Sequence, residues 1–127
     1  MKDRRPAPRA YKVSAVFDRI FEIARSDDPI LSRFRAALDA VYGEGLERVV
    51  LFGSRARGDA DPGSDYDVAI FLRDFGGFGR EAARIAAIET DILFDTGAFI
   101  NALPFKAGAH QDRTGLMHEL RREGREL

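Results

Sequence analysis

The chain has 127 residues, with 20 lysine and arginine residues against 21 aspartate and glutamate residues, so its net charge is near −1. This length fits one domain, and a hydrophobic fraction of 45% provides a compact core, which excludes a wholly disordered chain. The near-neutral charge argues against a dedicated nucleic-acid coat protein, so nucleic acid is not an expected partner.

Cysteine is absent, and His110 and His118 are the only histidines. Disulfide scaffolds, thiolate zinc sites, iron–sulfur clusters and cysteine nucleophiles are therefore excluded. A metal would be held mostly by carboxylates, which favours Mg²⁺, Mn²⁺ or Ca²⁺. No apolar run approaches 18 residues and no signal-peptide core follows the charged N-terminus, so we expect a cytoplasmic protein without membrane contact.

The N-terminal part of the sequence predicts a tail followed by a helix. Residues 1–12 hold five basic residues, one acid and two prolines, which predicts a flexible basic tail, with a phosphate-binding or partner-binding arm as the alternative. Residues 13–127 are expected to form a single domain. Apolar residues at helical spacing predict its first helix over residues 13–25.

A second helix is expected to begin at Asp28-Pro29, because aspartate is a favoured N-cap and proline a favoured first helical residue. Gly43 and Gly45 would end this helix. Six apolar residues share its predicted buried side: Ile30, Leu31, Phe34, Leu38, Val41 and Tyr42.

The remaining pattern predicts an α+β fold, a small mixed sheet flanked by helices. Both faces of the second strand are apolar beyond its first residues, so the face without helices needs cover from a loop, a second subunit or a partner. In chain order the expected elements are a strand at 47–52, a loop at 53–64, a strand at 65–72, a helix at 80–95, a strand at 98–105 whose Pro104 marks an edge, and a helix at 112–123.

The loop after the first strand has the composition of a phosphate-binding turn. Gly53 lacks a Cβ, so the backbone can approach a ligand closely, and free N–H groups at Ser54 favour phosphate oxygens. Arg57 lies one helical turn further on and offers a planar fork that suits the same anion. In the alternative interpretation, the loop's own charges pair on the surface: Arg55 and Arg57 with Asp59 and Asp61.

Two carboxylates follow at the start of the next strand. Asp65 and Asp67 are two residues apart, so in a strand they project to the same face. Two such charges about 4 Å apart repel by about 4 kcal/mol at an effective dielectric of 20. A divalent cation would compensate this repulsion. The sequence therefore predicts an anion site and a cation site side by side, as a metal–nucleoside triphosphate requires.

At these residues the chain resembles a known family. GSRARG followed by SDYDVAIFL is similar to the minimal nucleotidyltransferase (MNT) group of the DNA polymerase β-like superfamily, over roughly residues 28–123. The resemblance implies the polymerase β-like nucleotidyltransferase fold, Mg²⁺ (or Mn²⁺) as cofactor and ATP as substrate. It assigns Asp65 and Asp67 as catalytic metal ligands, and the nucleotide site to Gly53, Ser54, Arg57 and Ser64.

The resemblance also implies a partner, because the family includes antitoxins that pair with HEPN-domain proteins, some of which receive AMP on a tyrosine. One departure is that active members usually carry a third carboxylate on the next strand, where this chain has Asn101. We therefore expect AMP transfer to a HEPN-type partner. The alternatives are a catalytically weak antitoxin that acts by contact and, more remotely, transfer to a small molecule such as an aminoglycoside. Homo-oligomerisation stays open.

Several other polar residues are candidates for ligand contact or for structural positions. Lys106 and His110 are candidates for contact with a phosphate or second substrate, and Asp91 or Asp95 could replace the third acid only with unusual geometry. Tyr66 alternates with apolar residues and is expected to pack in the core, and His118 is expected at a surface or interface.

Overall fold

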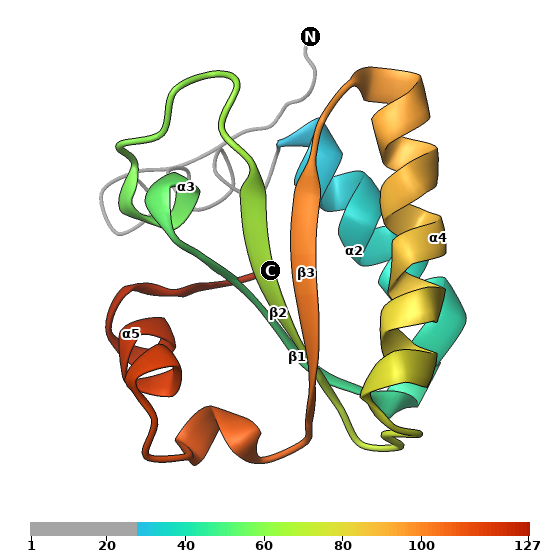
Figure 1. Ribbon diagram of the computed structural model, residues 1–127, viewed down its shortest axis with the longest axis vertical. Helices are drawn as coiled ribbons and strands as arrows, with labels where there is room; N and C mark the ends of the chain where they lie inside the picture. The colour runs from blue at the N-terminus through green and yellow to red at the C-terminus, as the bar shows by residue number, and fades with distance from the viewer. Residues whose placement is uncertain (1–27) are drawn as a thin grey trace, which may run out of the picture. The chain divides into compact units, whose positions relative to one another are not determined.

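The computed structural model describes residues 28–127, of which residues 33–127 form one compact unit (Figure 1). The predicted tail at 1–12 and helix at 13–25 lie outside the described residues. Helix α2 (Pro29–Tyr42) begins at the expected cap, where Asp28 Oδ1 accepts a hydrogen bond of 2.9 Å from the Ile30 N–H.

One residue of the predicted buried side of α2 is placed wrongly. Val41 is 40% exposed, whereas Phe34 and Leu38 are fully buried. The residue four positions after Leu38 is Tyr42, and it takes the inward position in the last turn. Val41 therefore lies at the margin of the apolar stripe.

The sheet is mixed, as the sequence predicts. Its strands are β1 (Leu46–Phe52), β2 (Tyr66–Leu72), β3 (Ile100–Lys106) and β4 (Arg125–Glu126), in the spatial order β3-β2-β1-β4. Strand β2 is parallel to β3, and β1 is antiparallel to both β2 and β4. Pro104 lies in β3, an edge strand, which confirms that expectation. The two residues of β4 are too few to carry a sequence pattern, so β4 was not predicted.

Three further α-helices follow α2 in the chain. They are α3 (Ser54–Arg57), α4 (Phe78–Thr96) and α5 (Gly115–Glu123), and single 3₁₀ turns occupy Gly43–Gly45 and Ala109–Gln111. Helix α5 starts later than expected because the Thr114 hydroxyl caps it, accepting from the Met117 N–H at 3.1 Å. No helix between residues 28 and 127 is both long and apolar enough to cross a membrane.

The helices cover both faces of the sheet. Figure 1 shows α4, and α2 from Arg33 onward, on one side and α5 on the other. On the α5 side, Met117 and Leu120 form one buried cluster with Val50, Ala69 and Phe71. The expectation that a loop, subunit or partner must cover this face is therefore wrong where Ala69 and Phe71 lie, because the last helix of the same chain covers them.

A buried acid joins the end of α2 to the start of α4. Glu81 is fully buried, and its carboxylate accepts hydrogen bonds from the Tyr42 hydroxyl at 2.9 Å and the Gly76 N–H at 2.7 Å. Burial alone would raise the pKa of Glu81, but these two hydrogen bonds and the charge of Arg84 outweigh it and lower the pKa. The same burial and hydrogen bond raise the pKa of Tyr42 to about 12, so its hydroxyl remains a donor.

We expect Glu81→Ala to lower the free energy of unfolding by roughly 1–3 kcal/mol at pH 7, because two donors lose their acceptor. Since the folded pKa is depressed, this contribution is present above the ordinary value of 4.5 and is lost as the pH falls below it. Urea unfolding of both proteins between pH 7 and pH 3 measures the difference. The control is Asp91→Ala, which removes an exposed acid of the same helix; an equal effect of both substitutions contradicts the assignment.

Candidate functional site

The two predicted metal ligands lie where β2 begins, beside the start of β3. In the parallel ladder Asp67 is the partner of Asn101, and on its other side Asp67 is paired with Phe52 of β1. The Asn101 Nδ2 donates a hydrogen bond of 3.1 Å to Asp65 Oδ2. Asn101 therefore faces the aspartate pair, which is the register that the sequence predicted for the position of the missing third acid.

The site is electrostatically unfavourable for negative charge. The pKa of Asp67 is raised, first by burial, then by the charge of Asp65 and more weakly by that of Glu119. The hydrogen bond from the Asn101 amide lowers the same pKa and partly offsets these effects. Asn101 thus supplies a donor, and no charge, to two carboxylates that repel each other.

The glycine turn is in contact with this pair. Gly53 has φ 75°, and a Cβ at this position would lie 2.6 Å from Asp67 Oδ2, so only glycine fits. Its carbonyl accepts from the N–H groups of Ala56 and Arg57, both at 3.1 Å. Within residues 28–127 the N–H groups of Ser54 and Arg55 have no hydrogen-bond acceptor. The turn therefore presents donors next to the carboxylates.

The arginines of α3 are held by groups of the protein. Arg57 pairs with Asp59 at 3.3 Å and with Glu123 of α5 at 3.6 Å, and these partners raise its pKa. This is in part the surface pairing that the sequence left open. The Arg57 side chain is nevertheless 41% exposed, so its guanidinium remains accessible to an anion.

Arg55 organises the loop between α3 and β2 instead of pairing with an acid. Its Nε donates to the Ser64 carbonyl and its Nη2 to the Pro62 carbonyl, each at 2.9 Å. Its guanidinium lies 3.9 Å from the ring centroid of Tyr66, whose side chain is buried as expected. The Ser64 hydroxyl accepts from the Asp61 N–H at 3.1 Å, so Ser64 also helps to shape the turn that precedes the aspartates.

Sequence reasoning missed the contribution of α5. Glu119 and Glu123 are half-buried, and their charges act on Asp67 and Arg57 respectively. The sequence pattern that could have identified them is their spacing of four residues. This spacing puts both on one side of the helix, near the buried Leu120 and facing the sheet. Without the packing of α5 on the sheet, that spacing does not identify what the acids face.

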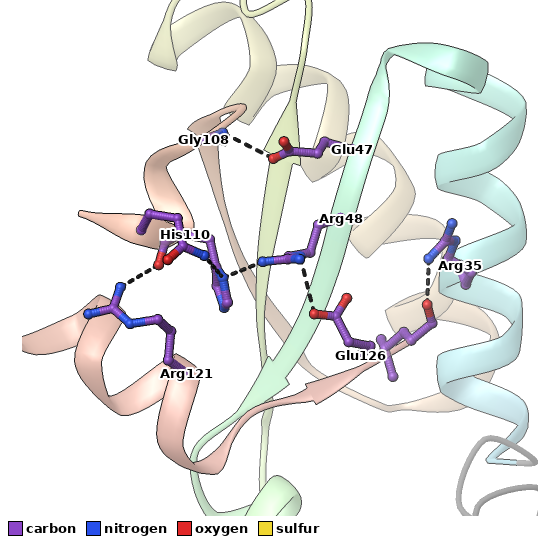
Figure 2. Close-up of polar contacts among 9 residues, drawn as sticks. Arg35, Glu47, Arg48, Gly108, His110, Arg121 and Glu126 are labelled. Atoms are coloured by element: carbon purple, nitrogen blue, oxygen red, sulfur yellow. Dashed lines mark hydrogen bonds and ion pairs between the residues drawn. The ribbon is translucent and has the colours of Figure 1, made fainter.

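Lys106 and His110, the candidates for contact with a phosphate or second substrate, lie away from the aspartate pair. Lys106 pairs with Leu72 at the far end of β2, roughly 16 Å along the strand from Asn101. Figure 2 shows His110 accepting a hydrogen bond from Arg48, which also pairs with Glu126 at 3.1 Å. Burial and the Arg48 charge lower the pKa of His110.

The structure also places Asp95 and His118. Asp95 pairs with Arg33 of α2 at 2.7 Å, so it does not replace the third acid, whereas His118 is exposed on α5 as expected.

The aspartate pair has the donor chemistry that Mg²⁺ or Mn²⁺ requires. Both side chains offer hard oxygen ligands, and a cation would relieve their repulsion. In the described part of the chain no group of three or more His, Cys, Asp and Glu residues is close enough to hold a metal ion. Phosphate oxygens of a bound nucleotide would therefore have to complete the coordination.

Comparison with known proteins gives consistent results. Residues 31–111 match the family model described as "Nucleotidyltransferase domain". A stretch of 45 residues is 42% identical to the "Putative protein adenylyltransferase MJ0141" of Methanocaldococcus jannaschii. This stretch covers 35% of the chain and 46% of the relative, so the match spans about half of that protein's length.

Two crystal structures share the fold. One is described as a toxin–antitoxin with AMP-PNP, with a TM-score of 0.56 and 18% identity, and the other is a mutant of the toxin–antitoxin MntA-HpeT, with a TM-score of 0.54 and 16% identity. Each match covers 75% of this chain and 69% of the other. Because the family model matches more than half of the sequence, the chain belongs to the nucleotidyltransferase domain family.

Proposed function

We propose that the chain binds ATP with Mg²⁺ (or Mn²⁺) and transfers AMP to a protein partner of the HEPN type. The observation that carries the proposal is the contact of the Gly53 turn with Asp67, which brings phosphate donors and paired carboxylates together. The name of the curated relative supports adenylyl transfer to protein. The AMP-PNP and toxin–antitoxin structures support a nucleotide and a partner.

In this proposal the residues of the turn bind and orient the triphosphate. The free N–H groups of Ser54 and Arg55 donate to phosphate oxygens, and Arg57 exchanges its carboxylate partners for a phosphate. Asp65 and Asp67 hold the cation, which would neutralise phosphate charge. Ser64 keeps the aspartate-bearing segment in place through its turn with Asp61.

The transfer itself is an in-line displacement at phosphorus. The acceptor hydroxyl oxygen bonds to the α-phosphorus while the bond between that phosphorus and the bridging oxygen to the β-phosphate breaks. AMP is thereby attached to the acceptor and pyrophosphate leaves. The hydroxyl proton must pass to a base, and the neutral amide of Asn101 is a poor one.

That missing base favours a second candidate function. Asn101 occupies the position beside Asp67 and donates to Asp65, and no third acid completes a metal site among residues 28–127. A protein with this site binds nucleotide and neutralises its partner by contact, with little catalysis. The two candidates differ in whether AMP reaches the partner.

We expect Asp65→Asn with Asp67→Asn to abolish Mg²⁺-dependent ATP binding without lowering the melting temperature, because the substitutions remove a charge repulsion. Calorimetric titration and a thermal melt measure the two effects. The control is Asp74→Asn with Asp91→Asn, which removes two exposed charges outside the site. ATP binding that survives in the double variant at 65 and 67 would sink the site assignment.

We expect Arg57→Ala to weaken binding of Mg²⁺-ATP more than binding of AMP, since a guanidinium that contacts the β- or γ-phosphate has no such group in the monophosphate. Titration with both nucleotides provides the comparison. An equal loss for both would place Arg57 in a purely structural role with Asp59 and Glu123.

We expect Asn101→Asp to increase AMP transfer from labelled ATP to the cognate partner, because the variant restores an acid that faces the pair. General-base assistance accelerates reactions by about 10²–10⁴. Asn101→Ala is the control, since it removes the amide without adding a base. Fast transfer by the unmodified protein that neither substitution alters would show that the reaction does not depend on a group at this position.

A further inference from the structure

The C-terminal segment, residues 123–127, lies beside the Gly53–Ser54 turn. Strand β4 pairs with β1 through Leu51 with Arg125 and Val50 with Glu126. Because the two strands are antiparallel, Arg125 lies beside the end of β1 that leads into Gly53. The segment is thus placed next to α3 although it is about 70 residues away in sequence.

Two side chains of this segment hold adjacent residues of α3. The Arg125 Nε donates to the Ala56 carbonyl at 2.7 Å, and Glu123 pairs with Arg57 at 3.6 Å. Ala56 is buried, and the carbonyls at the end of a helix have no partner within it. Arg125 therefore supplies a charge-assisted hydrogen bond to a group that α3 itself leaves unpaired.

The segment is rigidly placed before it reaches α3. A Cβ at Gly124 would lie 2.5 Å from both the Leu120 carbonyl and Val50 Cγ1, so the chain passes tightly between α5 and β1. Further along, the Leu127 N–H donates to the Val49 carbonyl at 2.9 Å. The Leu127 carbonyl accepts a hydrogen bond of 2.5 Å from Arg35 Nη1. Arg125 is fixed on both sides by these contacts.

Helix α3 needs an external support of this kind. It has four residues, and a single helical turn is not stable by itself. The backbone–backbone hydrogen bonds of α3 all lie within residues 53–59, so they do not attach the helix to the rest of the described chain. A small rotation of α3 would turn Ser54 and Arg57 away from the aspartates, so a fixed α3 lowers the ordering cost of binding a phosphate chain.

We propose that Arg125 is a positioning residue of the nucleotide site, which holds α3 through the Ala56 carbonyl so that the Gly53–Ser54 turn is preorganised for the triphosphate. This inference rests on the proposed ATP binding. It adds the C-terminal strand to the site and assigns Arg125 a role in affinity without contact to the nucleotide.

The test compares Mg²⁺-ATP affinity and melting temperature in the full chain for the wild type, Arg125→Met and Arg125→Lys. Titrations are made well below each melting temperature, so that all variants are folded. We expect Arg125→Met to raise the Kd about tenfold, the loss expected for one charge-assisted hydrogen bond. Arg125→Lys, which keeps a charged donor, should recover most of the affinity. Unchanged affinity in Arg125→Met overturns the inference.

The matched control is Arg113→Met, which removes an exposed arginine that has no hydrogen bond or ion pair within residues 28–127. It should bind as the wild type does. If Arg125→Met reduces the affinity no more than Arg113→Met does, the Ala56 contact has no role in binding. If it lowers only the melting temperature, its role is structural.

Amide hydrogen exchange provides a second readout that needs no nucleotide. We expect faster exchange in Arg125→Met, confined to the N–H groups of residues 56–59, which donate to the Gly53 and Ser54 carbonyls, with β2 and β3 unchanged. Arg125→Gln replaces Arg125→Met if the latter does not fold. Equal exchange in the turn contradicts the positioning role. A wild-type chain that does not bind Mg²⁺-ATP contradicts the proposed function, and the exchange experiment still decides whether Arg125 fixes α3.

Discussion

The site depends on holding two like charges close together at the point where β2 begins. A strand alone would not keep Asp65 and Asp67 together, since each charge disfavours the other and burial raises the pKa of Asp67. The sheet imposes the arrangement because the residues of β2 that follow the pair are buried and paired on both sides. The stability of the core thus maintains a local repulsion between Asp65 and Asp67 that a cation can relieve.

The loops around this pair are organised by arginines more than by apolar packing. Arg55 binds two carbonyls of the segment before β2 and stacks on Tyr66, and Arg125 binds a carbonyl of α3. A guanidinium has five donors in a fixed plane, so one side chain can fix several backbone groups of a loop that buries little surface. The Gly53–Ser54 turn is therefore positioned from two directions, by its own loop and by β4.

Asn101 places a neutral amide beside the aspartate pair. Its amide donates to Asp65 and so stabilises the pair in the absence of a cation, which a third carboxylate at this position would not do. An amide in place of a carboxylate at this position is also a poor base for an acceptor hydroxyl. The half-buried Glu119 adds negative charge near Asp67 from the opposite side, from α5. In the proposed function, the aspartate pair would bind the cation, and Asn101 would offer no base for proton transfer.

Sequence patterns predicted the mixed sheet and most helices, and they placed the Gly53 turn beside the aspartate pair, as the structure has them. Buried strands show as short apolar runs, and the Gly53–Ser54 turn and the aspartate pair are local patterns, as is the Asp28 cap of α2. The position of Asn101 came from the family resemblance, and the side-chain alternation of β3 left two possible registers. The pairing of Asn101 with Asp67 decides between them and turns Asn101 toward the pair.

Tertiary structure decided the features that depend on residues far apart in the chain. Strand β4 is too short for a pattern and exists because the edge of β1 is there to pair with it. Glu81 is buried only because Tyr42 and Gly76 supply donors, and His110 leaves the site because Arg48 and Phe71 hold it elsewhere. Packing sets the partners of a charged side chain, whereas its sequence neighbours mainly set its direction. For this reason the sequence determined which residues lie together at the candidate site, but not which residues hold them in place.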